Sequence, residues 1–463
     1  MDITRSCIYD KDPWNIAKLF IEEKSMIFLD GWSRGAVSYL ALFPQKTISV
    51  QDNIFCTEEG KNGKKTAAKT KDAFKELKRA LKATRQGRWF GYLAYPMVRY
   101  VENIKINKKN EFPDMFFVLP KIVIEFPYNK KQMNIYGKER DIKVVEKMIR
   151  EKRIKEKSIK EKKIRKEEKI REEEKDRGRR QEKAAITNIK SNFTKKQYIH
   201  AINKAKQYIL EGDSFQIKLS QRFTFNMRNT NPAAVYERLR KINPSPYSAF
   251  VKLKGLHVLC SSPEHLLSIR NNDISTTPIG GTYPYQKEDG RTIIKKFKND
   301  EKELAEHIML IDLERNDLGK GARAGSVKVD KFMKIEKYSH LVHLVTNITA
   351  EKEKNKDTID IIKAMFPGGT VTGCPKIRTM EIIDELEKTN RSLYTGSLGW
   401  IDAKGDCTLN IIIRTIIINT QTKKGFLQVG GGIVADSNPE KEYQETFWKA
   451  KALFESLGVT SVK

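Results

Sequence analysis

Four glutamates in two equally spaced pairs give this chain its clearest potential for chemistry. Glu442 and Glu445 stand three residues apart in PEKEYQETFW, and Glu303 and Glu306 repeat that spacing in KELAEHIML. A helix places residues i and i+3 on one face, so each pair would present two carboxylates side by side. Two such helices facing each other would offer hard oxygen ligands to Mg²⁺ and leave positions for substrate oxygens. The spacing therefore predicts a metal-assisted site for an acidic small molecule.

Three consecutive glycines precede one of these pairs. Gly430, Gly431 and Gly432 follow an apolar, strand-like stretch. Glycine lets backbone N–H groups come close to an anion because no Cβ is in the way. Lys449 lies one turn beyond Glu445 on the same face of the expected helix. Together these residues predict a cradle for an anionic ligand, whereas a glycine turn followed by a solvated amphipathic helix is the alternative.

Arg414 stands within the Ile-rich stretch TLNIIIRTIIINT, which we expect to be a strand. A guanidinium inside such a strand would be buried and would need a partner. A substrate carboxylate in bidentate contact would be one such partner, and a structural salt bridge is the alternative.

The elements that must position these residues alternate between strand and helix patterns. In the first 145 residues, strands are expected at 25–32, 46–51, 88–95 and 115–126, and a helix at 73–85. Farther along, a helical pattern runs from Asp300 to Asn316, with Gly319 as its stop signal. Neighbouring strand patterns lack intervening crossover helices, which predicts an α+β fold of antiparallel sheets flanked by helices.

A tract rich in Lys and Glu divides the chain. Residues 148–187 contain many Glu–Lys neighbours at i,i+4, which would support a solvated helix. Their isoleucines recur every five residues, a period that keeps no stripe on one helix face and so excludes a heptad seam. We interpret the tract as a charged low-complexity linker between an N-terminal α+β segment, 1–147, and a catalytic domain, 188–463.

Composition narrows the class of protein. The 463 residues are 39% hydrophobic, with 21 Phe and 16 Tyr, which is typical of a globular protein. The net charge of +29 comes from Lys spread along the chain, so we expect no nucleic-acid partner. The N-terminus lacks an apolar signal segment, and the apolar runs are too short to span a membrane. The five scattered cysteines have neither metal-ligand spacing nor the pattern of a disulfide framework, which favours a cytoplasmic protein.

Five motifs carry a resemblance to a known family: PSPYSAFV, SSPEHLL, ELAEHIMLIDLERNDLG, FPGGTVTGCPKIRTMEIIDELE and VGGGIVADSNPEKEYQET. They resemble the chorismate-utilising enzymes, which include anthranilate synthase component I, aminodeoxychorismate synthase component I, isochorismate synthase and salicylate synthase. The resemblance covers nearly all of residues 195–463, and FLDGW, FGYLAYPMVRYVENI and FPDMFFVLPKIVIEF extend it over 1–145. It implies chorismate as substrate and a large antiparallel β-sandwich core flanked by helices.

The resemblance also implies roles for single residues. Glu264 in SSPEHLL would be the general acid that assists departure of the hydroxyl at chorismate C4, and His343 would be the active-site histidine. Lys376 in GCPK has a structural or a catalytic role. The implied Mg²⁺ ligands, some of which could bind through water, are Glu303, Glu306, Glu442 and Glu445. The residues implied to hold the substrate carboxylates are Thr282, Thr370, Tyr394, Arg414, Gly430, Gly431, Gly432 and Lys449.

Gln216 indicates which nucleophile the enzyme uses. In the water-adding members of the family a lysine stands at this position, where it would be the base for an attacking water. Glutamine cannot deprotonate water, so Gln216 favours ammonia, which is already a nucleophile. None of the cysteines has the flanking residues of a glutaminase nucleophile. We therefore expect ammonia to come from a separate glutamine amidotransferase subunit.

The product is the open question at the sequence level. GGTVTGCPK, and VGGGIVADS followed by EYQET, resemble aminodeoxychorismate synthases, and the LLES motif of anthranilate synthases has no counterpart. These features predict 4-amino-4-deoxychorismate, a precursor of 4-aminobenzoate and folate. Many such enzymes, however, have PIKGTRPR, whose lysine forms an adduct at C2 before ammonia enters at C4. Here the segment is PIGGTYPY, with Gly280 at the lysine position and Tyr283 at the arginine position.

Two alternatives therefore stay open. One is anthranilate as the product, in tryptophan synthesis. The other is a decayed paralogue that binds chorismate without turnover, although the retained glutamates argue against decay because they would repel one another without a metal.

Overall fold

A computed structural model of the chain describes residues 3–9, 12–31, 37–60, 63–106, 108–128, 130–153, 186–228, 230–284, 301–337 and 341–459. Its N-terminal elements are β1 (Ile3–Ile8), α1 (Pro13–Ala17), β2 (Met26–Gly31), β3 (Val37–Gln51), β4 (Ile54–Glu59), β5 (Lys64–Lys69), α3 (Ala73–Ala83), β6 (Arg88–Leu93), β7 (Met115–Pro127) and β8 (Gln132–Gly137). Residues 139–153 are helical. The expected strands and helix of this segment are confirmed, although β3 begins well before its prediction.

The remaining elements follow the charged tract, of which 154–185 lie outside the described residues. Up to the long helix they are β9 (Ile186–Ser191), α5 (Lys195–Leu210), β10 (Gln216–Met227), α6 (Pro232–Ile242), β11 (Tyr247–Leu253), β12 (Leu256–Ser262), β13 (His265–Arg270), β14 (Asp273–Thr277), β15 (Ile279–Pro284) and α8 (Glu301–Gly319). After it come β16 (Lys328–Lys337), β17 (Leu341–Glu351), α9 (Thr358–Met365), β18 (Gly373–Cys374), α10 (Lys376–Leu386), β19 (Ser397–Asp402), β20 (Cys407–Asn410), β21 (Thr415–Asn419), β22 (Lys424–Ile433) and α11 (Pro439–Ser456).

The described strands form one hydrogen-bonded system that crosses the charged tract. β2 pairs with β11, placing Leu29 opposite Ala249, and β6 pairs with β19, placing Gly91 opposite Gly399. Trp14 of α1 packs edge-on against Tyr236 of α6 and Phe250 of β11. The segments on the two sides of the tract therefore share a sheet and a hydrophobic core.

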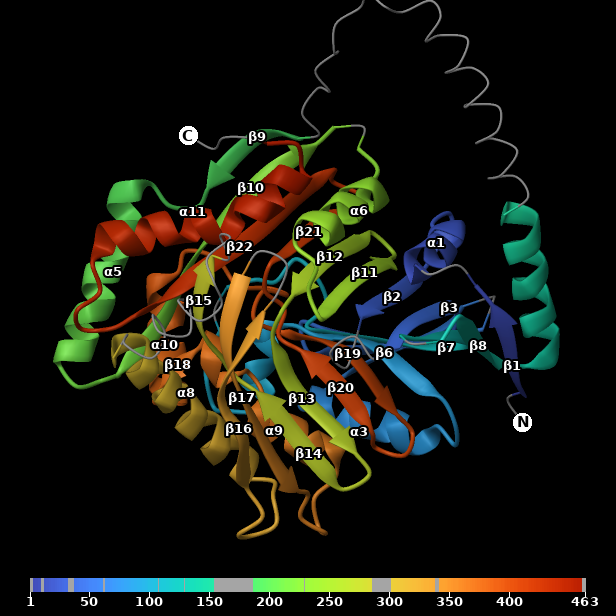
Figure 1. Ribbon diagram of the computed structural model, residues 1–463, viewed down its shortest axis with the longest axis horizontal. Helices are drawn as coiled ribbons and strands as arrows, with labels where there is room; N and C mark the ends of the chain where they lie inside the picture. Colours follow the sequence, from blue (N-terminus) through green and yellow to red (C-terminus); the bar gives the residue numbers. More distant parts are fainter. Residues whose placement is uncertain are drawn as a thin grey trace, which may run out of the picture.

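Helices flank the β-structure, whose described strands pair antiparallel (Figure 1). α11 lies against β22, α5 and α6, and α8 lies against β15, β17 and α9. The predicted α+β fold, with a large antiparallel β-sandwich core flanked by helices, is confirmed. Among the described helices, none combines the length and apolar character needed to cross a membrane.

Local sequence signals account for the start of α11, the helix that carries Glu442 and Glu445. α11 begins after Asn438, whose side chain accepts a hydrogen bond from the Lys441 N–H, and Pro439 occupies the first turn, where its missing N–H costs nothing. Glu440 and Glu442 lie in the first turn and interact favourably with the positive end of the helix dipole. The sequence therefore fixes both the start of α11 and the face that its carboxylates occupy.

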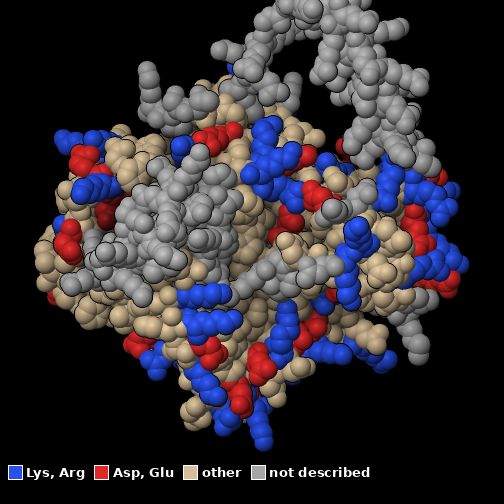
Figure 2. Space-filling model, viewed as in Figure 1, with Lys and Arg blue, Asp and Glu red and all other residues tan. Residues whose placement is uncertain are grey.

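The surface carries both signs of charge. On the face shown in Figure 2, Lys and Arg side chains are interspersed with Asp and Glu side chains over the described surface. All five cysteines are free thiols.

Candidate functional site

The three glycines continue the strand, so the glycine turn considered from the sequence is wrong. Gly430, Gly431 and Gly432 belong to β22 and face Ser220, Leu219 and Lys218 of β10 in an antiparallel ladder. The physical reason is the closeness of the two strands, since a Cβ on Gly430 would lie under 3.0 Å from the Leu219 carbonyl oxygen. Here glycine permits close strand contact rather than a turn.

The outer edge of β22 still offers backbone donors. The Ser220 N–H donates to Glu387 and the Lys218 N–H to the Thr372 carbonyl, so both point away from β22. In an antiparallel ladder their partners, Gly430 and Gly432, must then direct their own polar groups to the opposite edge. Pairing of β21 with β22 ends at Leu427, before the glycines.

α11 covers one face of this edge. A Cβ on Gly431 would lie 3.1 Å from Glu442 Oε2 and 3.9 Å from both Glu445 Oε1 and Lys449 Nζ. Lys449 pairs with Glu445 at 2.6 Å and donates to the Gly430 carbonyl at 3.0 Å, while Glu442 accepts from the Ser437 hydroxyl at 2.7 Å. The two carboxylates and the ammonium thus share one helix face, as the spacing predicted.

The side chains of Gln216 and Lys218 lie on the other face of the β10–β22 ladder, opposite α11. The Gln216 side chain donates to Glu306 Oε2 of α8 at 3.2 Å, which connects β10 to one of the predicted metal ligands. Its Oε1 is buried and has no hydrogen-bond partner among the described residues. Lys218 projects beside it, because residues i and i+2 of a strand share a face.

Lys218 is a site residue that the motifs did not identify. Its signal in the sequence is a charged residue two positions after Gln216 in a strand that is otherwise largely buried. Burial lowers the pKa of its amine and Lys449 adds to that effect, whereas Glu306 and Glu264 act in the opposite direction.

Glu264 lies between β12 and β13 and is buried, with 6% of its surface exposed. Its Oε1 makes no hydrogen bond of normal length and angle with the described residues, and the same is true of the nearby Thr370 hydroxyl. Burial raises the pKa of Glu264, although the Thr370 hydroxyl and the positive charges of Lys218, Lys449 and Arg414 oppose the rise. A carboxyl group held toward its protonated form suits a proton donor.

Arg414 lies between two strands, which corrects the prediction of one continuous Ile-rich strand. β20 ends at Asn410 and β21 begins at Thr415, and Arg414 between them has a φ of 49°. The strand is interrupted because the Ile411 and Ile412 N–H groups bond to the carbonyls of Glu264 and Gly396 instead of a neighbouring strand.

This break places the guanidinium of Arg414 beside the acid. Burial lowers its pKa, and Glu264 supplies the opposing negative charge. No carboxylate of the described residues lies within ion-pair distance, so the structural salt bridge considered from sequence is absent from this part of the chain. A substrate carboxylate remains a suitable partner.

Thr282 and His343 are brought together in the backbone. They are opposite one another in the pairing of β15 with β17, although 61 positions separate them in the sequence. Their side chains lie outside the described part of the structure, as do those of Glu303 and Tyr283.

Gly280 packs against His307, the histidine of the KELAEHIML segment. A Cβ at position 280 would lie under 3.0 Å from three atoms of His307, including Nδ1. The imidazole is fully buried and shares a 2.8 Å hydrogen bond with the Thr346 hydroxyl through Nε2, while Nδ1 has no partner among the described residues. Burial lowers the pKa of His307 to about 4. A larger residue at position 280 would require this ring to move.

Lys376 has structural contacts. Its ammonium pairs with the buried carboxylate of Asp317 in α8 and donates to the Pro367 carbonyl at 2.8 Å. Glu314, one turn before Asp317, accepts from the Gly369 N–H at 2.9 Å. Burial, together with Asp317 and against Lys376, raises the pKa of Glu314 to about 7. These groups join α8 to the loop that carries Thr370.

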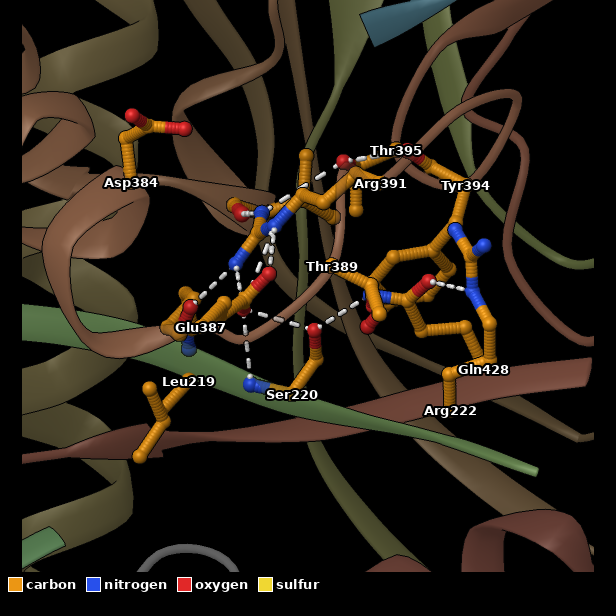
Figure 3. Close-up of polar contacts among 12 residues, drawn as sticks. Leu219, Ser220, Arg222, Asp384, Glu387, Thr389, Arg391, Tyr394, Thr395 and Gln428 are labelled. Carbon is orange, nitrogen blue, oxygen red and sulfur yellow. Dashed lines mark hydrogen bonds and ion pairs between the residues drawn. The ribbon is translucent and has the colours of Figure 1, made fainter. Parts of the chain in front are cut away.

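A buried ion pair borders the site on the other edge of β10 (Figure 3). Arg391 Nη2 lies 2.7 Å from Glu387 Oε1, and each side chain is 2% exposed. Glu387 also accepts from the Ser220 N–H and hydroxyl, and Gln428 donates to the same hydroxyl. Tyr394 lies beside this network, with the Arg391 guanidinium 5.6 Å from its ring centre. Burial raises the pKa of Tyr394.

The donor chemistry of the site fits Mg²⁺. The acidic side chains at the glycine edge offer only carboxylate oxygens, which Mg²⁺ prefers. In the part of the chain that the structure describes, no three His, Cys, Asp or Glu side chains converge as a ready-made metal centre. The fourth predicted ligand, Glu303, has its side chain outside that part.

Comparisons with known proteins agree on one group. The family described as chorismate binding enzyme matches residues 36–455. The chain is 35% identical to aminodeoxychorismate synthase component 1 of Bacillus subtilis (strain 168) over 95% of its own length and 93% of that protein. It is 38% identical to anthranilate synthase component 1 of Aquifex aeolicus (strain VF5), covering 86% of the chain and 81% of that protein.

Solved structures show the same likeness. Anthranilate synthase component I from Streptococcus pneumoniae TIGR4 matches with a TM-score of 0.74 and 29% identity, over 90% of this chain and 92% of that one. The menaquinone-specific isochorismate synthase of Escherichia coli matches in fold with a TM-score of 0.72 at 16% identity, over 99% of this chain and 94% of that one.

Proposed function

Because the chain belongs to the family of chorismate-binding enzymes, we propose that it aminates chorismate to 4-amino-4-deoxychorismate with ammonia as the nucleophile. The similarity to an aminodeoxychorismate synthase component 1 over nearly the full length of both chains supports this choice. The product would serve 4-aminobenzoate and folate synthesis in the cytoplasm.

The observation that carries the proposal is the amide of Gln216. Gln216 is the first residue of β10, and its amide donates to Glu306. A water-adding enzyme would need a base for water at this position. An amide has no useful proton affinity at neutral pH, so the nucleophile must arrive with its own lone pair available. Ammonia meets that requirement.

Glu264 is the proposed acid for the departing C4 hydroxyl. Burial raises its pKa toward the protonated form that a proton donor needs, and its unpaired Oε1 is available to a substrate oxygen. Arg414 and the outer edge of β22 at Gly430 and Gly432 would hold the substrate carboxylates through charge-assisted hydrogen bonds. Thr370, Tyr394 and Lys449 complete the proposed pocket.

Mg²⁺ is part of the proposal. Glu306 and Glu445 would be its main ligands, with Glu303 and Glu442 binding directly or through water. When bound, the ion would neutralise a substrate carboxylate and stabilise negative charge that develops during the reaction. Lys449 pairs with Glu445 in this structure, and binding of the ion by Glu445 would release the ammonium to contact the substrate.

The ammonia source is proposed to be a glutamine amidotransferase subunit. None of the five cysteines has the flanking residues of a glutaminase nucleophile. In four of them, Cys7, Cys260, Cys374 and Cys407, burial also raises the thiol pKa, which disfavours the reactive thiolate. We expect the isolated chain to use free ammonia and to leave glutamine intact. Glutamine turnover by the isolated chain would contradict this part of the proposal.

Anthranilate is the second candidate product, and one observation favours it. His307 fills the space beside Gly280, so the position that carries a nucleophilic lysine in many aminodeoxychorismate synthases has no room for one. Without an adduct at C2, that carbon is open to ammonia.

One product assay separates the candidates. The chain is incubated with chorismate, Mg²⁺ and ammonium chloride at alkaline pH, with and without a lyase that converts aminodeoxychorismate to 4-aminobenzoate. We expect 4-aminobenzoate only when the lyase is present. Anthranilate without the lyase would select the second candidate, and unchanged chorismate would select a binding protein without turnover.

Variants at Gly280 and His307 sharpen the assay. Gly280→Lys alone should destabilise the fold because the new side chain collides with His307, whereas Gly280→Lys with His307→Ala should accept it. Under the second candidate, the double variant should shift product from anthranilate toward aminodeoxychorismate. Thermal unfolding of both variants provides the control for folding.

A further inference from the structure

Glu314 is a buried carboxyl of α8 that none of the proposed roles uses. It lies eight positions after Glu306 in the same helix, and 2% of its surface is exposed. Oε1 accepts a hydrogen bond from the Gly369 N–H at 2.9 Å, whereas Oε2 has no partner among the described residues. Burying a carboxyl with half of its oxygens unpaired costs free energy, so this group is a candidate for a role beyond packing.

The Gly369 N–H belongs to a short turn that is held from two sides. Gly369–Val371 form a single 3₁₀ turn, and Arg391 donates to the Val371 carbonyl at its far end at 2.8 Å. At its near end, a Cβ on Gly369 would lie 2.5 Å from Leu313 Cδ2 and 3.2 Å from Glu314 Oε1. The turn therefore packs directly on α8, and Glu314 binds it where a larger residue would not fit.

The other side of the turn lies against the segment that carries the proposed acid. A Cβ on Gly368 would lie 2.6 Å from Ile411 Cδ1, and the Ile411 N–H donates to the Glu264 carbonyl at 3.1 Å. Thr370, in the middle of the turn, is buried, and its hydroxyl lies close enough to Glu264 to oppose the rise in pKa that burial causes. The turn thus lies between Glu314 and Glu264.

The charged groups that act on Glu314 come from three elements. Asp317 comes from the next turn of α8, Lys376 from the start of α10, and Glu264 from the connection between β12 and β13. Burial and the two carboxylates raise the pKa of Glu314 to about 7, whereas Lys376 and the Gly369 N–H oppose the rise. Glu314 and Glu264 are therefore coupled by their charges as well as through the turn that separates them.

We propose that Glu314 is a positioning residue for the acid step: by accepting from the Gly369 N–H, it fixes the Gly369–Val371 turn so that the Thr370 hydroxyl faces Glu264. The inference rests on the proposed function, because it concerns the C4 hydroxyl whose departure Glu264 assists. Both candidate products require the loss of that hydroxyl, so the role is the same for each. Glu314 acts through Thr370 and neither gives nor takes a proton in the reaction.

Three substitutions separate the acceptor oxygen from the charge, with kcat measured on the full-length chain with chorismate, Mg²⁺ and ammonium chloride. Glu314→Gln keeps an oxygen for the Gly369 N–H and loses the charge, so kcat should stay within about threefold of the wild type. Glu314→Met fills a similar space without an acceptor, and Glu314→Asp keeps the charge on a shorter side chain. Both should lower kcat by about 10- to 100-fold, because a small displacement of the turn misplaces the groups at the reacting bond.

A double-mutant cycle tests whether Glu314 acts through Thr370. Thr370→Val removes the hydroxyl, and in that background Glu314→Met should lower kcat by less than about twofold further, because the group that it positions is already absent. A purely structural role would give the same fold loss with and without the hydroxyl. Ile135→Val, in the buried part of β8, is the control for stability: it should lower Tm and leave kcat per folded molecule unchanged.

The outcomes separate this inference from the proposed function. Wild-type turnover combined with full activity of Glu314→Met, with loss in Glu314→Gln but not in Glu314→Asp, or with additive losses in the cycle would overturn the positioning role and leave the proposed function standing. No turnover by the wild type would remove the proposed function and the inference together. If Glu314→Met fails to fold, Glu314→Asp takes its place in the cycle with Thr370→Val and decides the question.

Discussion

Two polar clusters border the same stretch of β10 and differ in how completely their atoms are paired. In the cluster around Arg391, the guanidinium bonds to Glu387 and to two backbone carbonyls, and Glu387 accepts from Ser220 as well. At the glycine edge, Gln216 and Glu264 each bury an oxygen with no partner among the described residues. One cluster is closed and the other is open toward a ligand.

The difference teaches which polar groups serve the architecture and which serve chemistry. A buried charge without a partner costs free energy, so folding alone favours the closed arrangement seen around Arg391. The Glu387 charge raises the pKa of Arg391 although burial alone would lower it, which keeps the ion pair charged. The unpaired atoms at the glycine edge are retained at a cost to stability, and a bound substrate would satisfy them.

Breaking the closed cluster should cost the most stability. Arg391→Met would leave Glu387 buried without its countercharge, and we expect the free energy of unfolding to fall by about 3–5 kcal/mol. Urea denaturation measures this. Replacing both partners with apolar residues should cost less than the single change, and a single variant as stable as wild type would refute the description of this cluster as structural.

Removing the acid from the open cluster should affect the reaction instead. Glu264→Gln keeps the size of the side chain but cannot give up a proton, so we expect kcat to fall by about 10²–10³-fold. The unfolding midpoint should remain at or above that of the wild type, because the amide carries no charge to bury. Equal kcat in variant and wild type would exclude Glu264 as the acid.

Glu314 shares a feature with each cluster. Its Oε1 accepts from the Gly369 N–H, and its Oε2 is unpaired among the described residues. Its pKa is raised from 4.5 to about 7, so the folded protein keeps a proton that the unfolded chain releases. Stability from this group is full below about pH 4.5 and is lost as pH rises to about 7, by up to about 3 kcal/mol. Glu314→Gln should flatten this part of the stability–pH curve, measured by urea denaturation at several pH values; an unchanged slope would count against the shift.

Two glycines of β22 provide the smallest and most closely matched comparison. A Cβ on Gly430 would meet the Leu219 carbonyl, which cannot move easily, so Gly430→Ala should destabilise by about 1–3 kcal/mol. A Cβ on Gly432 would meet only the ends of Lys218 and Gln216, which can shift. Gly432→Ala should therefore change stability by less than about 1 kcal/mol and lower kcat. An equal loss of stability in the two variants would contradict this difference between the closed and the open cluster.

The sequence predicted elements and site residues to different extents. Strong local patterns placed α3 and α11, because an apolar stripe and capping residues act within one element. The sequence allowed a turn at the glycines because glycine alone does not reveal that a neighbouring strand lies close. Arg414 was assigned to a strand because the residues that interrupt it, Glu264 and Gly396, are distant in the chain.

By itself, the sequence determined the α+β class, the carboxylate face of α11 and the family motifs, since each depends on residue type and spacing within one short segment. Only the tertiary structure decided that Gln216 meets Glu306, that His307 fills the space beside Gly280, and that Lys218 and Gln216 converge beside Gly432. The reason is physical. Those facts depend on how strands and helices far apart in the chain pack together, and packing fixes distances that residue order leaves undefined.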